Sequence, residues 1–410
     1  MDEEKPISVA EARARVLAAA QKISDIERVP LDDALGRTLA KDLAARRTQP
    51  PSAVSAMDGY ALRTGDIATL PAQLKLIGES AAGHGYAGAV GARECVRILT
   101  GAPIPKGADA VLMQEYVTVE GGTVTALKTA TRDDNIRGAG LDFSTGDVLL
   151  HAGEKLGPVH CALAAAMDHA LLPVLRRPRI AILATGDELV KPGEAASTHQ
   201  IVASNAYAVA GYVRLAGGEP IDLGIAPDDL GAIEAAIAKA RDAKADVLVT
   251  LGGASVGDRD LVKPALAREG MELGFWRIAM RPGKPLIHGR IGAMPILGLP
   301  GNPVSAIVCT VVFLMPLMEA MHGRVPANGT GEPAVLGTPM RANDGRQNFV
   351  RAALATREDG VAIATPLASQ DSSLLRVLAE ADALIIRPPN APEAKAGDPC
   401  RILHLPKPVI

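Results

Sequence analysis

Hydrophobic and polar positions in the first part of the chain follow a helical spacing. Residues 8–21 place Ser8 and Glu11 three positions apart, ahead of an alanine-rich segment, which is the capping-box signature of a helix start. Residues 31–42 show a similar pattern. We therefore expect two helices at the start of the chain.

The pattern changes to short β-type runs between residues 48 and 140. This region is rich in Gly and Pro, and its apolar runs are brief, as in QLKLIGE, ECVRILT and AVLMQEYVTV. Helical sequence returns after residue 141 with CALAAAMDHA. We therefore expect an inserted β module over residues 48–140, which splits an N-terminal helical domain into residues 1–47 and 141–176.

Apolar strands alternate with helical segments over residues 177–324. The runs RIAILAT, ADVLVTL and MPILGL are separated by helical patterns around 205–216, 230–243 and 303–321. This alternation predicts a doubly wound parallel sheet with helices on both faces, a three-layer α/β/α domain. The whole chain is therefore expected to be a multidomain protein of α/β and β class.

The last part of the chain returns to β-type sequence after an apolar segment. Residues 304–318 are apolar but fall short of the ~20 residues of a membrane span, so we expect a buried helix. A Pro- and Gly-rich linker over 322–333 follows. Beyond it, short apolar runs predict a small C-terminal β-barrel domain over residues 328–410.

Composition and charge exclude several classes of protein. The chain has 410 residues, 48% of them hydrophobic, and a net charge of −3, so it has no basic field that would hold a nucleic acid. Its four cysteines include no C-x-x-C pair, which argues against a zinc site or a disulfide framework. The acidic start lacks the pattern of a signal peptide. We expect a cytoplasmic protein that binds no membrane.

Three predicted strands of the α/β region end in loops that suit an anionic ligand. Ligands of parallel sheets bind at this edge, where the carboxyl ends of the strands meet. Asn302 is placed as a helix N-cap and Pro303 as the first helical residue, so we expect free helix N–H groups to face the third loop. Glycine-rich turns also occur here without a ligand, so one loop alone decides little. The loop residues are Thr185, Gly186, Asp187, Glu188, Gly252, Gly253, Ser255, Gly257, Asp258, Pro300, Gly301, Asn302 and Pro303.

Carboxylates and cations occur close together near these loops. Arg277, Arg281 and Lys284 follow the loop that ends near Asp260, in a segment stiffened by prolines. Carboxylates that hold a metal, beside cations that neutralise phosphate charge, suit a Mg²⁺-bound phosphoanhydride. The alternative is structural, because Asp228 and Asp260 each lead a helical segment and could be N-caps.

Seven motifs occur in order along the chain: SAMDGYA, RILTGAPIPKGADAV, NIRGAGLD, ILATGDEL, LGGASVGDRD, FWRIAMRPGKP and LGLPGNPVSA. Together they resemble the molybdopterin molybdenumtransferase family, called MoeA in bacteria, to which the E domain of gephyrin is related. The resemblance implies a homodimer with an active site shared between two chains. It also implies that molybdate is inserted into adenylylated molybdopterin with Mg²⁺-dependent release of AMP, and that other cofactor-assembly proteins make transient contacts.

The resemblance also implies roles for individual residues. Molybdate would meet Arg281, Lys284, Arg351 from NFVRA, and a serine of QDSSLL, Ser373 being chosen over Ser372. The nucleotide loop would include Gly252, Gly253, Ser255 and Gly257, and the metal ligands would be Asp228, Asp258 and Asp260. Catalytic roles would fall to Asp58, Thr100, Asp142, Glu188, Asp228, Asp260 and Arg277, of which Asp58, Thr100 and Asp142 come from the partner subunit.

Two further points remain open at this level. Asp-Gly is a frequent hairpin turn, so Asp58 taken by itself also has a structural explanation. The family stretch after NIR is reduced here to Gly138–Leu141 before Asp142, and Arg277 and Arg281 stand where several members have lysine. The competing functions are a gephyrin-like scaffold without catalysis and an adenylyltransferase that acts one step earlier.

Replacing Asp260 separates the catalytic from the capping explanation. We expect Asp260→Ala to slow AMP release strongly with little loss of stability, because the proposed contribution of this carboxylate is charge and not packing. Turnover measured beside thermal unfolding checks this. A variant as active as the parent would show that Asp260 is only a helix cap.

Overall fold

Two compact units make up the chain, and each has hydrophobic cores of its own. The computed structural model describes residues 5–253, 261–326 and 329–406. Contacts between residues group the chain into unit 1, Met1–Ile26 with Leu175–Ile410, and unit 2, Glu27–Val174. Strands β1 (Ile26–Pro30) and β12 (Leu171–Leu175) pair with each other, and all but one residue of each belongs to unit 2.

Unit 2 contains the β module that the sequence predicts. Its main sheet has the order β7-β4-β6-β5-β9-β8, and the buried Leu62 and Leu74 belong to its core. Gly59 is required because a Cβ there would lie 2.1 Å from the carbonyl oxygen of Leu112 on the paired strand. The strands are β4 (Gly59–Leu62), β5 (Ala72–Ser80), β6 (Glu94–Ile98), β7 (Ala110–Met113), β8 (Val117–Glu120) and β9 (Thr123–Ala126).

The rest of unit 2 holds less helix than expected. Helix α2 (Pro158–Ala166) is present, but an α-helix over residues 31–42 is wrong, since only Leu31–Asp33 forms a 3₁₀ turn. Gly36 has a positive φ of 75°, and the residues after it pair as extended backbone with the segment around Lys155. Short ribbons complete the unit: β2 (Leu43–Ala44) with β11 (Val148–Leu150), and β3 (Val54–Ser55) with β10 (Ile136–Arg137). Further 3₁₀ turns are Thr64–Ile67 and Gln114–Tyr116.

The sheet of the α/β domain has the order β16-β13-β17-β21-β20-β18. Its first four strands pair in parallel, which confirms the parallel sheet. The remaining two pairings, β21 with β20 and β20 with β18, are antiparallel. Alternate residues of β13 enter two different cores, so the strand is buried on both faces, which explains its continuous apolar sequence. The strands are β13 (Arg179–Thr185), β16 (Glu219–Ala226), β17 (Val247–Leu251), β18 (Glu272–Phe275), β20 (Ile287–Ile291) and β21 (Met294–Leu299).

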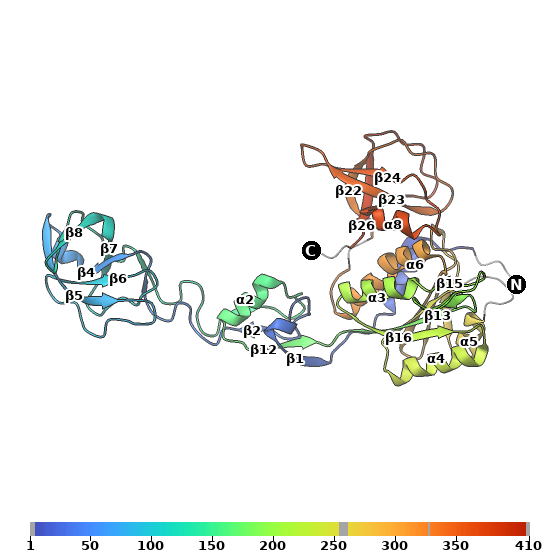
Figure 1. The fold of residues 1–410 in the computed structure, drawn as a ribbon, viewed down its shortest axis with the longest axis horizontal. Helices are drawn as coiled ribbons and strands as arrows, with labels where there is room; N and C mark the ends of the chain where they lie inside the picture. The colour runs from blue at the N-terminus through green and yellow to red at the C-terminus, as the bar shows by residue number, and fades with distance from the viewer. Residues whose placement is uncertain (1–4, 254–260, 327–328, 407–410) are drawn as a thin grey trace. The chain divides into compact units, whose positions relative to one another are not determined.

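Helices cover both faces of this sheet, as the alternating sequence predicts. Helices α3 (Asn205–Leu215) and α6 (Pro303–Cys309) lie on one side, and α4 (Leu230–Asp242) and α5 (Val262–Arg268) lie on the other (Figure 1). A short pair, β14 (Leu189–Val190) and β15 (Ile201–Val202), follows β13.

The apolar helix over 303–321 is continuous but not regular. It consists of α6, a π-helical turn at Thr310–Leu314, and α7 (Met315–Met321). The π turn precedes Pro316, whose missing N–H and bulky ring disturb the regular hydrogen bonding of the turn before it. This is the one helix among the described residues that is long and apolar enough to cross a membrane, and 78% of its most apolar window is buried. It is therefore a core helix, as expected.

The C-terminal region closes into a barrel, which confirms the small β-barrel domain. The order β23-β24-β22-β26-β25 returns to β23 through the pairing of β23 with β25, and α8 (Leu375–Glu380) lies beside it. A short strand from the α/β domain, β19 (Met280–Arg281), adds in parallel to β23. The barrel strands are β22 (Glu332–Leu336), β23 (Gln347–Thr356), β24 (Ala362–Pro366), β25 (Ala383–Arg387) and β26 (Pro399–His404).

Helix α1 (Val9–Ala18) starts as the capping box predicts, with the Ser8 hydroxyl accepting a hydrogen bond from the backbone N–H of Glu11 at 3.1 Å. The sequence predicts that this helix belongs to an N-terminal helical domain, whereas its contacts group it with unit 1. Val9 and Val16 share a core with the helices of the α/β domain, and α1 packs against α7. Amphipathic sequence predicts the helix but not the partner of its apolar face.

Phe313 tests the importance of this shared core. Its side chain is fully buried in the π turn, so Phe313→Ala should lower the free energy of unfolding by ~3–5 kcal/mol through lost burial and a cavity. Phe313→Leu, which fills most of the space, is the control and should cost about 1 kcal/mol. Urea unfolding of the full chain measures both. Equal stabilities of the two variants would contradict tight packing here.

Candidate active site

A cavity of about 610 Å³ opens at the carboxyl ends of β13, β17 and β21, and we call it the strand-end cavity. All three predicted loops contribute to it, so the structure brings them together as the topology requires. Thr185 is nearly buried, and its hydroxyl donates to the Leu251 carbonyl at 3.5 Å. The predicted residues that line the cavity are Thr185, Gly186, Glu188, Asp228, Gly252, Gly253, Lys284, Pro300, Asn302 and Pro303.

Gly252 and Gly253 are the residues that let the second loop pass so close to the first. Both have positive φ, 93° and 62°. A Cβ on Gly252 would lie 2.9 Å from the Thr185 carbonyl oxygen, and one on Gly253 would lie 2.1 Å from a methyl group of Val262. Glycine is therefore required for this loop to pack against Thr185 and Val262, and the loop adds backbone without side chains to the wall of the cavity.

Acidic side chains gather beside the strand-end cavity. Asp187, Glu188 and Asp228 line an adjoining cavity of about 790 Å³, the acidic cavity. A carboxylate oxygen of Asp187 accepts a hydrogen bond from the backbone N–H of Asp228 at 3.0 Å. The N-cap of α4 is Asp229, whose carboxylate accepts from Ala232 N, and not Asp228. The capping explanation for Asp228 is therefore wrong.

The remaining candidates of the second loop lie outside the described residues. These are Ser255, Gly257, Asp258 and Asp260. Within the residues that the structure describes, no three His, Cys, Asp or Glu side chains are arranged to hold a metal ion. Of the predicted metal ligands, the structure therefore places only Asp228.

Cations meet in a smaller cavity of about 280 Å³ between the α/β domain and the barrel, which we call the cationic cavity. The predicted Arg281 and Lys284 line it, together with Asn302, whose side-chain amide donates to the Ser372 hydroxyl at 3.0 Å. Ser372, Ser305, Gln370 and Arg346 also line it. Sequence reasoning chose Ser373 over Ser372, and did not single out Ser305, Gln370 or Arg346.

We expected the helix that follows Asn302 to present free N–H groups to a ligand. In the structure, part of this helix end is already bonded to the protein. Asn302 and Pro303 stand at the predicted N-cap and first helical positions, but the Asn302 side chain makes no cap. The backbone N–H of Val304 donates to the Ser372 carbonyl at 3.1 Å. A loop of the barrel therefore already uses part of this helix end, so the expected anion cradle is corrected to a partly occupied one.

Arg351 is built into the barrel loop and is absent from the lining of the cationic cavity. It is 1% exposed, and its guanidinium donates to the Asp371 carbonyl at 2.8 Å and to the Gln370 side chain at 3.3 Å. Burial lowers the pKa of Arg351. Ser373 is exposed, and its hydroxyl is bonded within the same loop, donating to the Asp371 carboxylate at 2.7 Å. Both side chains shape the loop that presents Ser372.

Arg277 lies against the ring of Trp276, with its guanidinium carbon 4.4 Å from the ring centre. Lys263 packs against the same ring at 4.4 Å. Neither cation lines the strand-end, acidic or cationic cavity. The structure therefore places Arg277 in a cation–π stack and not beside Arg281 at the cavity.

In unit 2, Asp58 and Thr100 are held together. The Asp58 carboxylate accepts hydrogen bonds from the backbone N–H of Thr100 at 2.7 Å and from its hydroxyl at 2.8 Å. These two bonds, the backbone one first, lower the pKa of Asp58. Asp142 lines a separate cavity of about 630 Å³ with Arg137 and Gly101. Asp58 and Thr100 are therefore in direct contact, and Asp142 lines a cavity together with Gly101, the residue that follows Thr100.

Comparison with known proteins identifies the family. Three family models match in order: the MoeA N-terminal region (domain I and II) at residues 7–167, a probable molybdopterin binding domain at 181–320, and the MoeA C-terminal region (domain IV) at 333–405. A molybdopterin molybdenumtransferase of Haemophilus influenzae is 33% identical, over 96% of this chain and 97% of its own length. The chain belongs to the molybdopterin molybdenumtransferase family. The enzyme of the same name from Bacillus subtilis is 34% identical, over 98% and 95%.

A solved structure of this family agrees with the fold. The molybdopterin biosynthesis MoeA protein from Pyrococcus horikoshii OT3 aligns with a TM-score of 0.82 and 29% identity, covering 98% of this chain and 100% of its own. Arg346 lines the cationic cavity but is absent from the residues that we selected from the sequence. Its position in the sequence could have revealed it. It lies just ahead of the NFVRA motif, next to the strand that carries the recognised Arg351.

The hydrogen bonds from Thr100 give a pH-dependent signature. A lowered pKa means that the bonds favour the ionised carboxylate. Their contribution to the free energy of unfolding is therefore complete above the ordinary Asp pKa and is lost as pH falls through the lowered value. Thr100→Val keeps the backbone donor but removes the hydroxyl, so the pKa of Asp58 should rise part of the way to its usual value. Carboxyl-detected NMR titration measures it.

A matched control for this experiment lies in the same unit. Thr131 holds Asp134 with the same two bonds, from backbone N–H and from hydroxyl, and lowers its pKa in the same way. Thr131→Val should move the pKa of Asp134 and leave Asp58 unchanged. An unshifted Asp58 in Thr100→Val would contradict the assignment of cause.

Proposed function

We propose that this chain is a molybdopterin molybdenumtransferase, which inserts molybdenum from molybdate into adenylylated molybdopterin and releases AMP. One observation carries the proposal: the strand-end cavity and the cationic cavity share Lys284 and Asn302 in their walls. A site for a phosphate-bearing substrate thus adjoins a site for a small oxyanion. Both substrates of this reaction are anionic, and both need to be bound side by side.

The residues of the two cavities suit a phosphate-bearing substrate in one and a small oxyanion in the other. Gly252 and Gly253 add backbone without side chains to the wall of the strand-end cavity, where a phosphoanhydride would bind, and Lys284 at the shared wall neutralises charge from either side. Arg281, with the hydroxyls of Ser305 and Ser372, supplies donors for a tetrahedral oxyanion. Binding and orientation, with AMP as the leaving group, are what this arrangement contributes to the reaction.

Mg²⁺ is included in the proposal on the strength of the carboxylates. Asp228 lines both the acidic and the strand-end cavities, and Asp258 and Asp260 belong to the adjoining loop. Carboxylate oxygens are ligands that Mg²⁺ accepts, and the ion would neutralise charge on the phosphates when bound. Among the described residues no three carboxylates form a metal-binding group, so Asp228 is the described side chain that would help to hold the ion.

The assembly and location are proposed on the family's precedent. We propose a cytoplasmic homodimer in which Asp58, Thr100 and Asp142 of one subunit complete the site of its partner, with transient contacts to other cofactor-assembly proteins. The scaffold and adenylyltransferase alternatives gain no support, because relatives named for the transferase match over nearly the full length of the chain.

Release of AMP tests the proposed function directly. Given adenylylated molybdopterin, Mg²⁺ and molybdate, the purified chain should release AMP and yield a cofactor that activates a molybdenum-free enzyme. Omitting molybdate is the control for cofactor formation. If no AMP appears above the protein-free rate, the proposed function is rejected.

A further inference from the structure

Arg346 is a half-buried cation at the seam between the barrel and the α/β domain. It stands directly before β23, and β23 pairs in parallel with β19, which carries Arg281. The backbone N–H of Gln347 donates to the Ala279 carbonyl at 2.9 Å, which fixes this register. Strand pairing therefore brings Arg346 to the same small cavity as Arg281 and Lys284.

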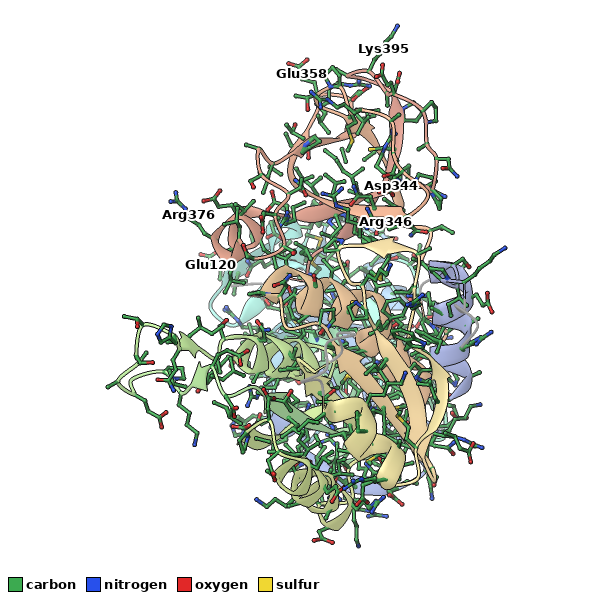
Figure 2. The ribbon with its side chains drawn as sticks, turned by 90° about the vertical axis from the view of Figure 1, so that its right-hand side faces the viewer. Glu120, Asp344, Arg346, Glu358, Arg376 and Lys395 are labelled. Carbon is green, nitrogen blue, oxygen red and sulfur yellow. The ribbon has the colours of Figure 1, made fainter. Side chains whose placement is uncertain are left out.

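Asp344 holds the Arg346 side chain in place. Its carboxylate accepts from the guanidinium Nε at 3.1 and 3.3 Å and from Nη2, and it also accepts from the backbone N–H of Arg346 at 2.9 Å. The two side chains lie side by side in Figure 2. Among the hydrogen bonds of the described residues, none uses Nη1 of Arg346, so this group is available to a ligand.

The balance of charge decides whether the cationic cavity attracts an anion. Arg281, Lys284 and Arg346 line it, and so does Asp371. Asp344 stands beside the cations, and Arg346 first, then Arg281, lowers the pKa of its carboxyl, so it is ionised at neutral pH. With Arg346 the group carries a net positive charge of one, and without it the charges cancel.

We propose that Arg346 contacts the tetrahedral oxyanion substrate directly, as the third cation of the cationic cavity, with Asp344 as the positioning residue that orients it. This inference rests on the proposed function for the nature of the oxyanion. A planar guanidinium with a free N–H group is suited to donate to oxyanion oxygens. Arg346 is thus part of the binding site and not a surface ion pair.

The chain offers a matched ion pair as the control. Arg357 and Asp359 have the same spacing in sequence and the same bidentate contact, at the turn after β23, and neither lines the cationic cavity. Their side chains are 50% and 53% exposed, close to the 41% and 47% of Arg346 and Asp344. Exposed pairs of this kind contribute little to stability.

Equilibrium dialysis of the full-length protein against molybdate tests the proposal. Arg346→Ala should bind molybdate at least about tenfold more weakly than the parent, the effect of one lost charge-assisted hydrogen bond. Arg346→Lys keeps the charge and should lose less, and Arg357→Ala should bind within twofold of the parent. Thermal unfolding of each variant shows that the protein is folded.

The AMP-release assay separates this inference from the proposed function. Arg346→Ala should raise the KM for molybdate about tenfold with a smaller change in kcat. Molybdate affinity of Arg346→Ala within twofold of the parent, or an equal loss in Arg357→Ala, overturns the inference even if the parent releases AMP. Absence of AMP release by the parent rejects the function, whereas Arg346-dependent dialysis results would still support the oxyanion contact.

Discussion

The seating of Ser372 on the start of α6 is the interaction on which the rest of the site depends. The Ser372 carbonyl accepts from the backbone of Val304, and its hydroxyl accepts from the Asn302 side chain. These two bonds connect a barrel loop to the loop that follows a central strand of the α/β sheet. They close the cationic cavity on one side and fix the wall that it shares with the strand-end cavity.

The contacts of Ser372 with the start of α6 are stable because the loop that carries Ser372 has hydrogen bonds of its own. Gln370 accepts from the backbone and side chain of Arg351, and donates to the Arg351 and Leu367 carbonyls at 3.1 and 3.0 Å. A buried guanidinium is costly unless its donors are used, and here the loop carbonyls use them. The resemblance implies that Arg351 meets molybdate, and in the structure its guanidinium bonds to the loop that presents Ser372.

The local pattern of hydrophobic and polar positions predicts most of the strands and helices of the fold. Strands buried on both faces read as continuous apolar runs, and a capping box marked the start of α1, so β13, β17, β21 and α1 could be predicted. Positions in the strand-end loops followed from topology. The packing partner of α1 and the position of Arg346 at the cationic cavity depend on how distant segments of the chain dock. Residue spacing within one segment does not determine that docking.

The two cavities also differ in when they can exist during synthesis. The strand-end cavity is complete once the chain has passed Pro303, since its walls come from the α/β sheet alone. The cationic cavity needs Ser372, some seventy residues later, and barrel strands that follow still further on. Because domains form as units while the chain emerges, the residues of the strand-end cavity are all synthesised well before the last residues of the cationic cavity. A protein truncated before the barrel would keep the first and lack the second.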